Sequence, residues 1–485
     1  MLTVILAQPR RIRRILSMEA STGTPCPGCQ HLQVQLQELQ ARVRLLEEEL
    51  AKARKNSSTS SKPPSSDLVK PPSHPEDDGQ SKRSAGAQPG HPKHDRPLLP
   101  PELVTSTIAH AVEICPHCGH GLQSIDQPPR IVQQIDYREI PLLVEEHHCL
   151  PFWCESCQKV HYGRLPDAVQ RSGLVGPGLT SLIAYLKGFC HASYSTIRKY
   201  LRDVIKVTIS RGQLAKVIGK VSAALQTPYQ ELLDALKDQR ILNVDETGHK
   251  DGKVRMWTWC FRAELYTLFK IDARRSADVL MDVLGKEFKG VLGCDFFSAY
   301  RRFMRECDVI LQFCLAHLIR DVKYLTTLPG KEDKAYGEGL CEALRQLFRV
   351  IHDREKMTPV AFATALQAAR DEVLSRGIDW APKTPNGQRI AKRFREYGES
   401  YFEFITTPGV EPTNNLAEQA IRFVVIDRLI TQGTRGEAGQ RFCERIWTVI
   451  ATCTQQGRSV MEFLTKAVEA LFQGKEGPTL LPQQP

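Results

Sequence analysis

The sequence has 485 residues, with 65 Lys and Arg against 55 Asp and Glu, which gives a formal net charge of +10. Hydrophobic residues make up 41% of it and charged residues 25%, which excludes a chain that is wholly disordered, collagen-like or embedded in a membrane. Its first residues are apolar and precede a group of arginines, the reverse of the order in a secretory signal. We therefore expect a cytoplasmic protein of roughly three structural units, with its 15 cysteines kept reduced.

Residues 1–55 predict an N-terminal extension followed by a short coiled coil. Apolar residues recur there at alternating steps of four and three, which is the a/d seam of a heptad pattern; they are Leu32, Leu36, Leu39, Val43, Leu46 and Leu50. This seam predicts a homo-oligomer. Since only about three heptads are present, a single amphipathic helix packed on its own protein is the alternative.

Residues 56–101 are rich in Ser, Pro, Lys and Gly and contain almost no large apolar residue. Such a segment buries too little surface to offset the entropy lost on ordering, so we expect a flexible linker. Its basic residues either contact DNA phosphates non-specifically or belong to a plain tether.

Residues 102–170 contain two CxxC pairs, Cys115 with Cys118 and Cys154 with Cys157. Two such pairs supply the four thiolates of a tetrahedral Zn²⁺ site, and residues 130–153 between them read as two strands. This combination predicts a zinc ribbon with a closed, structural site. Reduced cysteines in an ordinary core are the alternative.

Residues 171–238 have a helical pattern throughout. Within them, residues 194–204, a short break, and a second helix over 210–221 with Ser210 at its start have the outline of a helix-turn-helix. The second helix would carry Arg211 and Lys216 into a DNA groove. Two helices that simply pack together give the same pattern, so both interpretations stay open.

Residues 239–430 contain the pattern from which we predict a catalytic domain. Three strands, a helix and two further strands are expected in this order: 241–248, 254–263, 265–272, 276–284, 290–295 and 309–317. This is the order of a ribonuclease H-like sheet, in which the first and fourth strands are neighbours. Asp245 and Asp295 would then lie side by side at the ends of their strands.

Two adjacent carboxylates repel each other unless cations neutralise them, and oxygen ligands of this kind suit Mg²⁺ or Mn²⁺. Glu418 offers a third carboxylate in the first turn of a helix that Asn414 or Asn415 caps. Two ions held by the three side chains would activate a hydroxyl and stabilise the leaving oxygen in phosphoryl transfer. Taken singly, an Asp at a strand end is also a common turn former, and a Glu there also complements the helix dipole.

Several motifs occur together in a characteristic order: NSSTSSKPPSSD, GAQPGH, the paired CxxC, VDETG, DFFSAY, CLAH and EPTNNLAEQAIR. In these the sequence resembles the insertion sequence 66 family of bacterial transposases, the TnpC-type proteins with a DDE triad, from about Cys26 to about Leu471. The resemblance implies metal-dependent DNA cleavage at the ends of a mobile element and transfer of the 3′-hydroxyl to target DNA. By it, Asp245, Asp295 and Glu418 form the triad.

The resemblance also implies terminal inverted repeats as substrate, helper proteins of the same element and assembly on paired DNA ends, near the bacterial nucleoid. Glu411 is the alternative to Glu418 as the third residue of the triad, but it lies in a loop before the helix. Glu246 would point to the strand face opposite Asp245. His317, which we expect at the end of the fifth strand, Arg320 and Arg422 are candidate DNA contacts.

A helical insertion is expected at about 318–412, and a helical element with a tail over 431–485. The alternative function is a catalytically silent, zinc-dependent DNA-binding protein or repressor derived from a transposase. The presence of all three acidic residues argues against it, because a pure binder would tolerate the loss of any of them.

Overall fold

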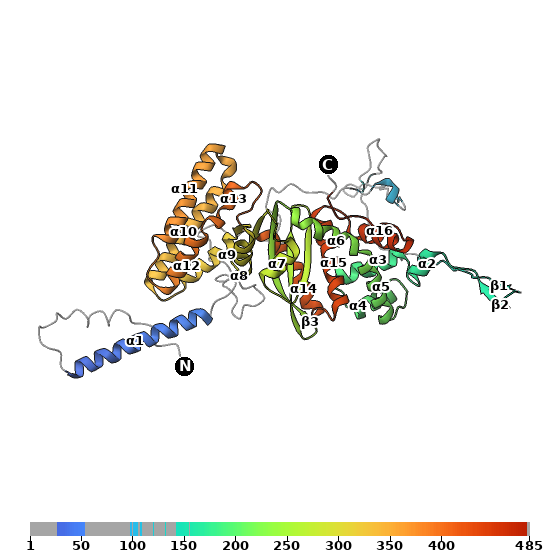
Figure 1. Ribbon diagram of the computed structural model, residues 1–485, viewed down its shortest axis with the longest axis horizontal. Coiled ribbons are helices and arrows are strands. Elements are labelled where there is room, and N and C mark those ends of the chain that lie inside the picture. The colour runs from blue at the N-terminus through green and yellow to red at the C-terminus, as the bar shows by residue number, and fades with distance from the viewer. Residues whose placement is uncertain are drawn as a thin grey trace.

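The computed structural model describes residues 27–53, 142–154 and 156–482, together with short stretches between 98 and 131. Over these residues the protein is a mixed α/β structure built around one five-stranded sheet (Figure 1). This confirms the expected mixed α/β class. In the described part, none of the helices has the length and apolar character needed to cross a membrane.

The central sheet has the strand order β5-β4-β3-β6-β7. Its strands are β3 (Ile241–Asp251), β4 (Val254–Arg262), β5 (Thr267–Asp272), β6 (Val291–Cys294) and β7 (Ile310–Phe313). β3 pairs antiparallel with β4 and parallel with β6. The first and fourth strands of the sheet are therefore neighbours, as expected. β3 is longer than expected, because residues 246–251 continue the hairpin with β4. Helices α7 (Ala277–Leu284) and α8 (Ser298–Cys307) connect β5 to β6 and β6 to β7.

Helices from both ends of the described core pack together beyond the β5 edge of the sheet (Figure 1). They are α2 (Asp167–Ser172), α3 (Pro177–Gly188), α4 (Tyr194–Asp203), α5 (Arg211–Ala224), α6 (Gln226–Ala235), α15 (Glu437–Gln455) and α16 (Val460–Gln473). The predicted pair of helices is present as α4 and α5, and Ser210 Oγ accepts a hydrogen bond from Gln213 N at 3.1 Å as the N-cap of α5.

From the end of β7 to Thr431 the chain consists mainly of helices. The helices are α9 (Leu315–Thr326), α10 (Lys331–His352), α11 (Pro359–Ile378), α12 (Pro385–Tyr397) and α13 (Glu403–Thr406), followed by α14 (Asn415–Thr431). Figure 1 shows α10, α11 and α12 gathered at one end of the molecule, away from α15 and α16. Short 3-10 turns occur at Pro101–Leu103, Leu236–Asp238, Arg354–Lys356 and Glu399–Tyr401.

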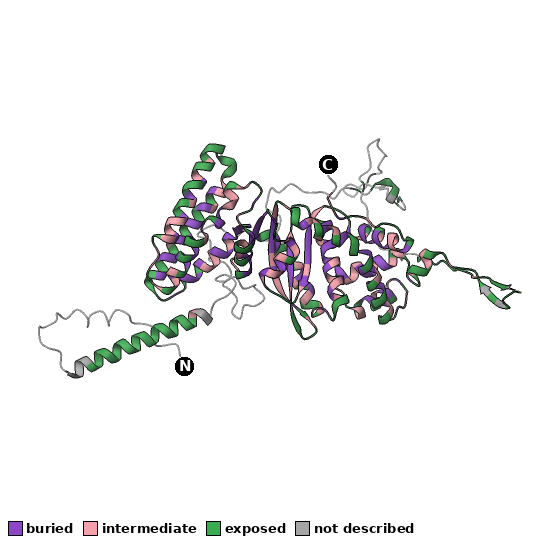
Figure 2. Ribbon diagram, in the orientation of Figure 1, coloured by how far each residue is buried: buried purple, intermediate pink, exposed green. Residues whose placement is uncertain are grey.

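The large buried side chains concentrate in the sheet and the helices against it, whereas α1 (Pro27–Ala53) is exposed from His31 to Leu50 (Figure 2). In residues 102–170, the region expected to form a zinc ribbon, the structure describes β1 (Pro151–Cys154) and β2 (Lys159–Tyr162). These two strands form an antiparallel hairpin. Cys115, Cys118 and residues 56–97 of the expected linker lie outside the described residues. Residues 142–150 have no regular structure, so the second of the two expected strands is present only from Pro151 onward, and most of the first lies outside the described residues.

Candidate active site

The two aspartates lie on neighbouring strands at the same level. Asp245 is within β3, and Asp295 is the first residue after β6. Asn243 pairs with Gly293 in the parallel ladder, and each aspartate comes two residues after its member of this pair. A Cβ at Gly293 would meet the Asn243 Nδ2 atom at 2.4 Å, so a larger residue there would displace Asn243. The register therefore brings Asp245 and Asp295 to one edge of the sheet.

The start of α14 is attached to this edge by Asn414. Its Nδ2 donates to the Val244 carbonyl at 2.8 Å, and its Oδ1 accepts from Asn243 Nδ2 at 3.0 Å. Its backbone N–H donates to Cys314 Sγ at 3.1 Å. Asn414 therefore occupies the predicted N-cap position without a side-chain cap, because its amide is used by β3.

A second attachment fixes the direction of α14. Further along the helix, Arg428 Nη1 donates to Thr247 Oγ1 at 3.1 Å and to the Gly248 carbonyl. Because both ends of α14 bind the same strand, Glu418 in its first turn is held over the region of Asp245.

Negative charge is concentrated around Asp245. Burial, together with the negative charges of Glu246, Asp295 and Glu418, raises the pKa of Asp245 well above its usual value. Burial also raises the pKa of Asp295, whose Oδ1 accepts a hydrogen bond from Phe297 N at 2.8 Å. A divalent cation would relieve this repulsion, and carboxylate oxygens are the ligands that Mg²⁺ and Mn²⁺ prefer. The donor set therefore fits such an ion.

Glu246 makes its own hydrogen bonds with side chains of the protein. Tyr300 Oη donates to Glu246 Oε2 at 2.5 Å, and Arg275 Nε donates to Glu246 Oε1 at 2.9 Å. Burial and the nearby Asp295 charge raise the pKa of Glu246 to about 7. Its carboxylate oxygens are thus occupied by side chains of the protein.

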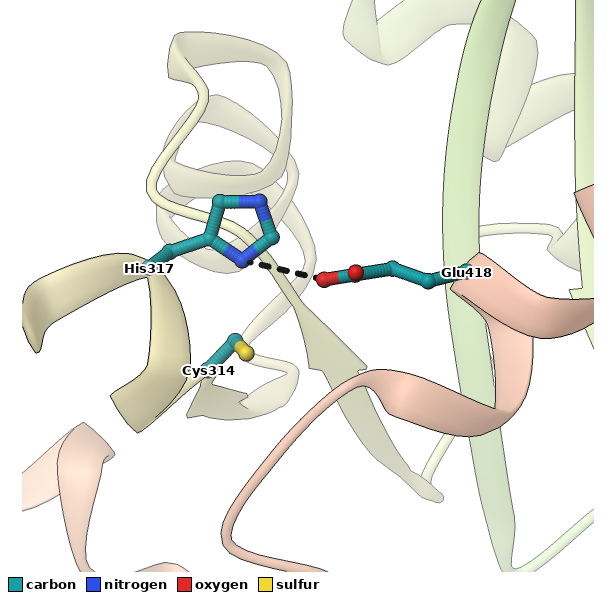
Figure 3. Close-up of side chains that lie close together, drawn as sticks. All are labelled: Cys314, His317 and Glu418. Atoms are coloured by element: carbon teal, nitrogen blue, oxygen red, sulfur yellow. Dashed lines mark ion pairs between the residues drawn. The ribbon is translucent and has the colours of Figure 1, made fainter. Parts of the chain in front are cut away.

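Glu418 lies among side chains from α9 (Figure 3). Its Oε1 is 3.3 Å from Arg320 Nη2 and 3.4 Å from His317 Nδ1. Ligand atoms of Cys314, His317 and Glu418 all lie within 4.8 Å of one another. Among the described residues, no such group of three or more includes Asp245 or Asp295. The three acidic side chains thus surround one region without forming a compact cluster in this conformation.

The expectation that His317 ends a strand was wrong. β7 stops at Phe313, Cys314 is the N-cap of α9, and His317 lies in the first turn of that helix. The reason is the helical spacing of the buried apolar residues that follow, Leu315, Leu318, Val322 and Leu325, which overrides the apolar strand pattern before it. His317 is buried, and burial with the charges of Arg320 and Arg393 lowers its pKa to about 3.

The remaining candidate residues are spread over the surface. Arg422 on α14 and Lys216 on α5 are exposed. Arg211 is also exposed, and its Nη2 donates to Ser195 Oγ at 2.6 Å. Glu411, the competitor of Glu418, is exposed in the loop before α14. Of the zinc-ribbon candidates, Cys154 is in β1 and Cys157 is exposed in the turn that follows.

Two features of the site were not found from the sequence. The first is the anchoring of α14 by Asn414, which the paired asparagines before the helix indicated only as a cap. The second is the pairing of Arg320 with Glu418, which lie 98 residues apart in the sequence. Their spacing carries no local signal, because the contact arises only when α9 and α14 meet beside the sheet.

Comparison with known proteins gives two family matches and a curated relative. Residues 172–441 match the family described as "Transposase IS66 family", and residues 8–97 match a "Family of unknown function (DUF6444)". A curated relative, "Uncharacterized protein y4qI" of Sinorhizobium fredii (strain NBRC 101917 / NGR234), is 24% identical over 347 residues. That alignment covers 64% of this chain and 62% of the relative. Since the family match spans more than half of the sequence and includes the whole sheet, the chain belongs to the IS66 family of transposases.

Proposed function

We propose that this protein cleaves DNA strands at the ends of its mobile element and transfers the freed 3′-hydroxyl to target DNA. Asp245, Asp295 and Glu418 act as the DDE triad of a ribonuclease H-like core. The observation that carries this proposal is that Asp245 and Asp295 lie at the same level of β3 and β6, and that Asn414 anchors the start of α14 to β3, so that the Glu418 charge acts on Asp245. The strand order β5-β4-β3-β6-β7 and the family membership support it.

Two Mg²⁺ or Mn²⁺ ions at the triad would supply activation of the attacking hydroxyl and stabilisation of the leaving oxygen. Asp245 and Asp295 would hold the cations, since they lie at the same level of the neighbouring strands β3 and β6. Glu418 completes it by exchanging its contact with Arg320 for a place beside the aspartates. Arg320 is then available for a DNA phosphate.

His317 positions DNA as an uncharged side chain. Because its pKa lies near 3, the ring is neutral at physiological pH and acts as a hydrogen-bonding group toward a phosphate. Arg422, Arg211 and Lys216 are exposed and supply further phosphate contacts along the bound DNA.

The other parts of the chain would recognise and assemble the DNA ends. A zinc ribbon made by Cys115, Cys118, Cys154 and Cys157 binds Zn²⁺ and supports recognition of the terminal inverted repeats. The exposed apolar seam of α1 supports a homo-oligomer, and helper proteins of the same element join this assembly near the nucleoid.

A strand-joining assay tests the catalytic assignment. The full chain is incubated with Mg²⁺ and labelled DNA from the borders of its own gene, beside the variants Glu418→Gln, Glu411→Gln and Asp245→Asn. We expect Glu418→Gln and Asp245→Asn to lower joining at least about 100-fold, with end binding nearly unchanged, because they remove metal ligands and leave the DNA-binding surface intact.

Glu411→Gln is the matched control, since it neutralises an exposed acidic residue seven positions before Glu418 and should join normally. Normal joining by Asp245→Asn would refute the triad. Specific end binding by the wild-type protein without any cleavage would favour a repressor.

A further inference from the structure

We propose that Cys314, His317 and Glu418 form a binding site for a Zn²⁺-type cation, which shares Glu418 with the proposed carboxylate site for Mg²⁺. The three side chains come from the N-terminal turn of α9 and the first turn of α14, and they point toward one another in Figure 3. Each offers one ligand atom, and these atoms lie within 4.8 Å of one another.

The spacing of the histidine and the glutamate is that of two ligands on one ion. His317 Nδ1 and Glu418 Oε1 are 3.4 Å apart, and the contact does not have the geometry of a hydrogen bond. Two ligand atoms about 2.05 Å from a tetrahedral zinc ion lie about 3.3 Å apart. The pair is therefore preset for coordination, and Cys314 Sγ needs only a small approach to become the third ligand.

The histidine nitrogen has no other partner that would explain its position. The His317 side chain is 9% exposed, and its Nδ1 is buried without a hydrogen bond. A buried nitrogen left without a hydrogen bond destabilises the folded protein. Because this nitrogen faces Glu418 and Cys314, a bound cation would satisfy it.

Cys314 supplies a sulfur ligand that must lose its proton to the ion, because burial raises the pKa of its thiol to about 11. Cys314 is the N-cap of α9, where the positive end of the helix dipole stabilises a negative charge. The Asn414 backbone N–H donates to its Sγ at 3.1 Å and orients the sulfur. Thiolate and imidazole are ligands that Zn²⁺ prefers and Mg²⁺ avoids, so the two sites differ in selectivity. Three protein ligands leave the fourth position to water or DNA.

Arg320 is the group that opposes this site, because its Nη2 lies 3.3 Å from the same Glu418 oxygen. A cation and Arg320 therefore compete for Glu418. One consequence rests on the proposed function: a zinc-loaded site withholds Glu418 from the catalytic aspartates, so Zn²⁺ inhibits Mg²⁺-dependent joining. The binding itself does not depend on that function.

The test counts bound zinc and uses no DNA. The full chain is dialysed against Zn²⁺, and the zinc retained per chain is measured by elemental analysis for the wild type, Cys314→Ser, His317→Gln and Cys341→Ser. We expect Cys314→Ser and His317→Gln each to hold one zinc fewer than the wild type, whatever the ribbon contributes. Cys341→Ser, which alters another buried cysteine outside the cluster, should retain the full number.

A Co²⁺ spectrum gives a second readout that is specific for the thiolate. The difference between the wild type and His317→Gln should contain the charge-transfer absorption of one cobalt–thiolate bond, while circular dichroism shows that both proteins are folded. Equal zinc content in the wild type, Cys314→Ser and His317→Gln would overturn the proposal. So would an equal loss in Cys341→Ser. Should Cys314→Ser unfold, the zinc count of His317→Gln decides alone.

Discussion

His249 shows how a single buried side chain links the sheet to the segment after α14. It is 2% exposed, and its Nε2 lies 3.1 Å from Thr434 Oγ1, whose hydroxyl in turn donates to Asp251 Oδ1 at 2.9 Å. Nε2 is therefore the ring nitrogen that carries the hydrogen, and Nδ1 is buried without a partner. Burial, with the nearby Arg428 charge, lowers the pKa of His249 to about 4.

This pKa predicts acid sensitivity. Because the unfolded chain binds a proton near pH 6.5 and the folded protein only near pH 4, stability is complete above about pH 6.5 and falls as the pH drops toward 4. His249 should account for about 2 kcal/mol of the stability lost between pH 7 and pH 5. Urea unfolding at the two pH values measures this loss.

His249→Gln keeps an N–H donor for Thr434 and does not titrate, so the loss between the two pH values should shrink by that amount. His352→Gln is the control, because His352 is exposed at the end of α10. An unchanged pH dependence in His249→Gln would show that another group controls the acid response.

At the level of elements, α15 closes the outer edge of the sheet. Glu444, Thr448 and Thr452 accept hydrogen bonds from the backbone N–H groups of Ile271, Phe269 and Thr267 at 2.6, 3.0 and 3.2 Å. The three acceptors follow one another every four residues on α15, a rise of about 6.0 Å, and the three donors every two residues on β5, a rise of about 6.8 Å. Because the two rises are similar, each acceptor lies opposite its donor. The helix side chains thus satisfy an edge strand that would otherwise be open to pairing with another chain.

Thr448→Val should destabilise the protein by about 1–3 kcal/mol. The substitution preserves shape but leaves the Phe269 N–H buried without an acceptor. Denaturant unfolding gives the difference from the wild type. Thr454→Val on the same helix is the control and should cost less than about 1 kcal/mol, since Thr454 Oγ1 only donates to the Ile450 carbonyl of its own helix. Equal costs for both variants would contradict the edge-closing role.

At the level of the whole molecule, α1 carries an apolar seam that the described chain leaves uncovered. Its side chains at Leu32 and Leu50 are 66% and 48% exposed, and the four seam residues between them fall within this range. An exposed stripe of this length and heptad spacing is the contact surface of a coiled coil, so we expect a second copy to cover it.

Light scattering on the full chain tests this assembly. Leu39→Lys with Leu46→Lys should convert the oligomer to a monomer, because two charges would be buried in the seam. Gln37→Lys with Ala41→Lys adds the same charge on the face opposite the seam and should leave the assembly intact. A wild-type chain that is already monomeric at micromolar concentration would refute the role of α1.

Local patterns predicted much of the fold because the information they used is local. The strands of the sheet, α7, the α4–α5 pair and the helix carrying Glu418 follow from apolar periodicity and capping residues. The errors occurred where tertiary pairing extended or replaced a local preference. β3 continues to Asp251 because β4 pairs with it, and the residues after Phe313 form α9 because the helix buries their apolar face.

The sequence by itself determined which residue types are available for chemistry: Asp245, Asp295 and Glu418, the CxxC pairs and the Cys314–His317 motif. Only the tertiary structure decided how they meet. Asn414 sets α14 against β3, and the crossing of α9 and α14 gives Glu418 the neighbours His317 and Arg320. The physical reason is that these contacts join segments about 100 to 170 residues apart, so no local spacing encodes them.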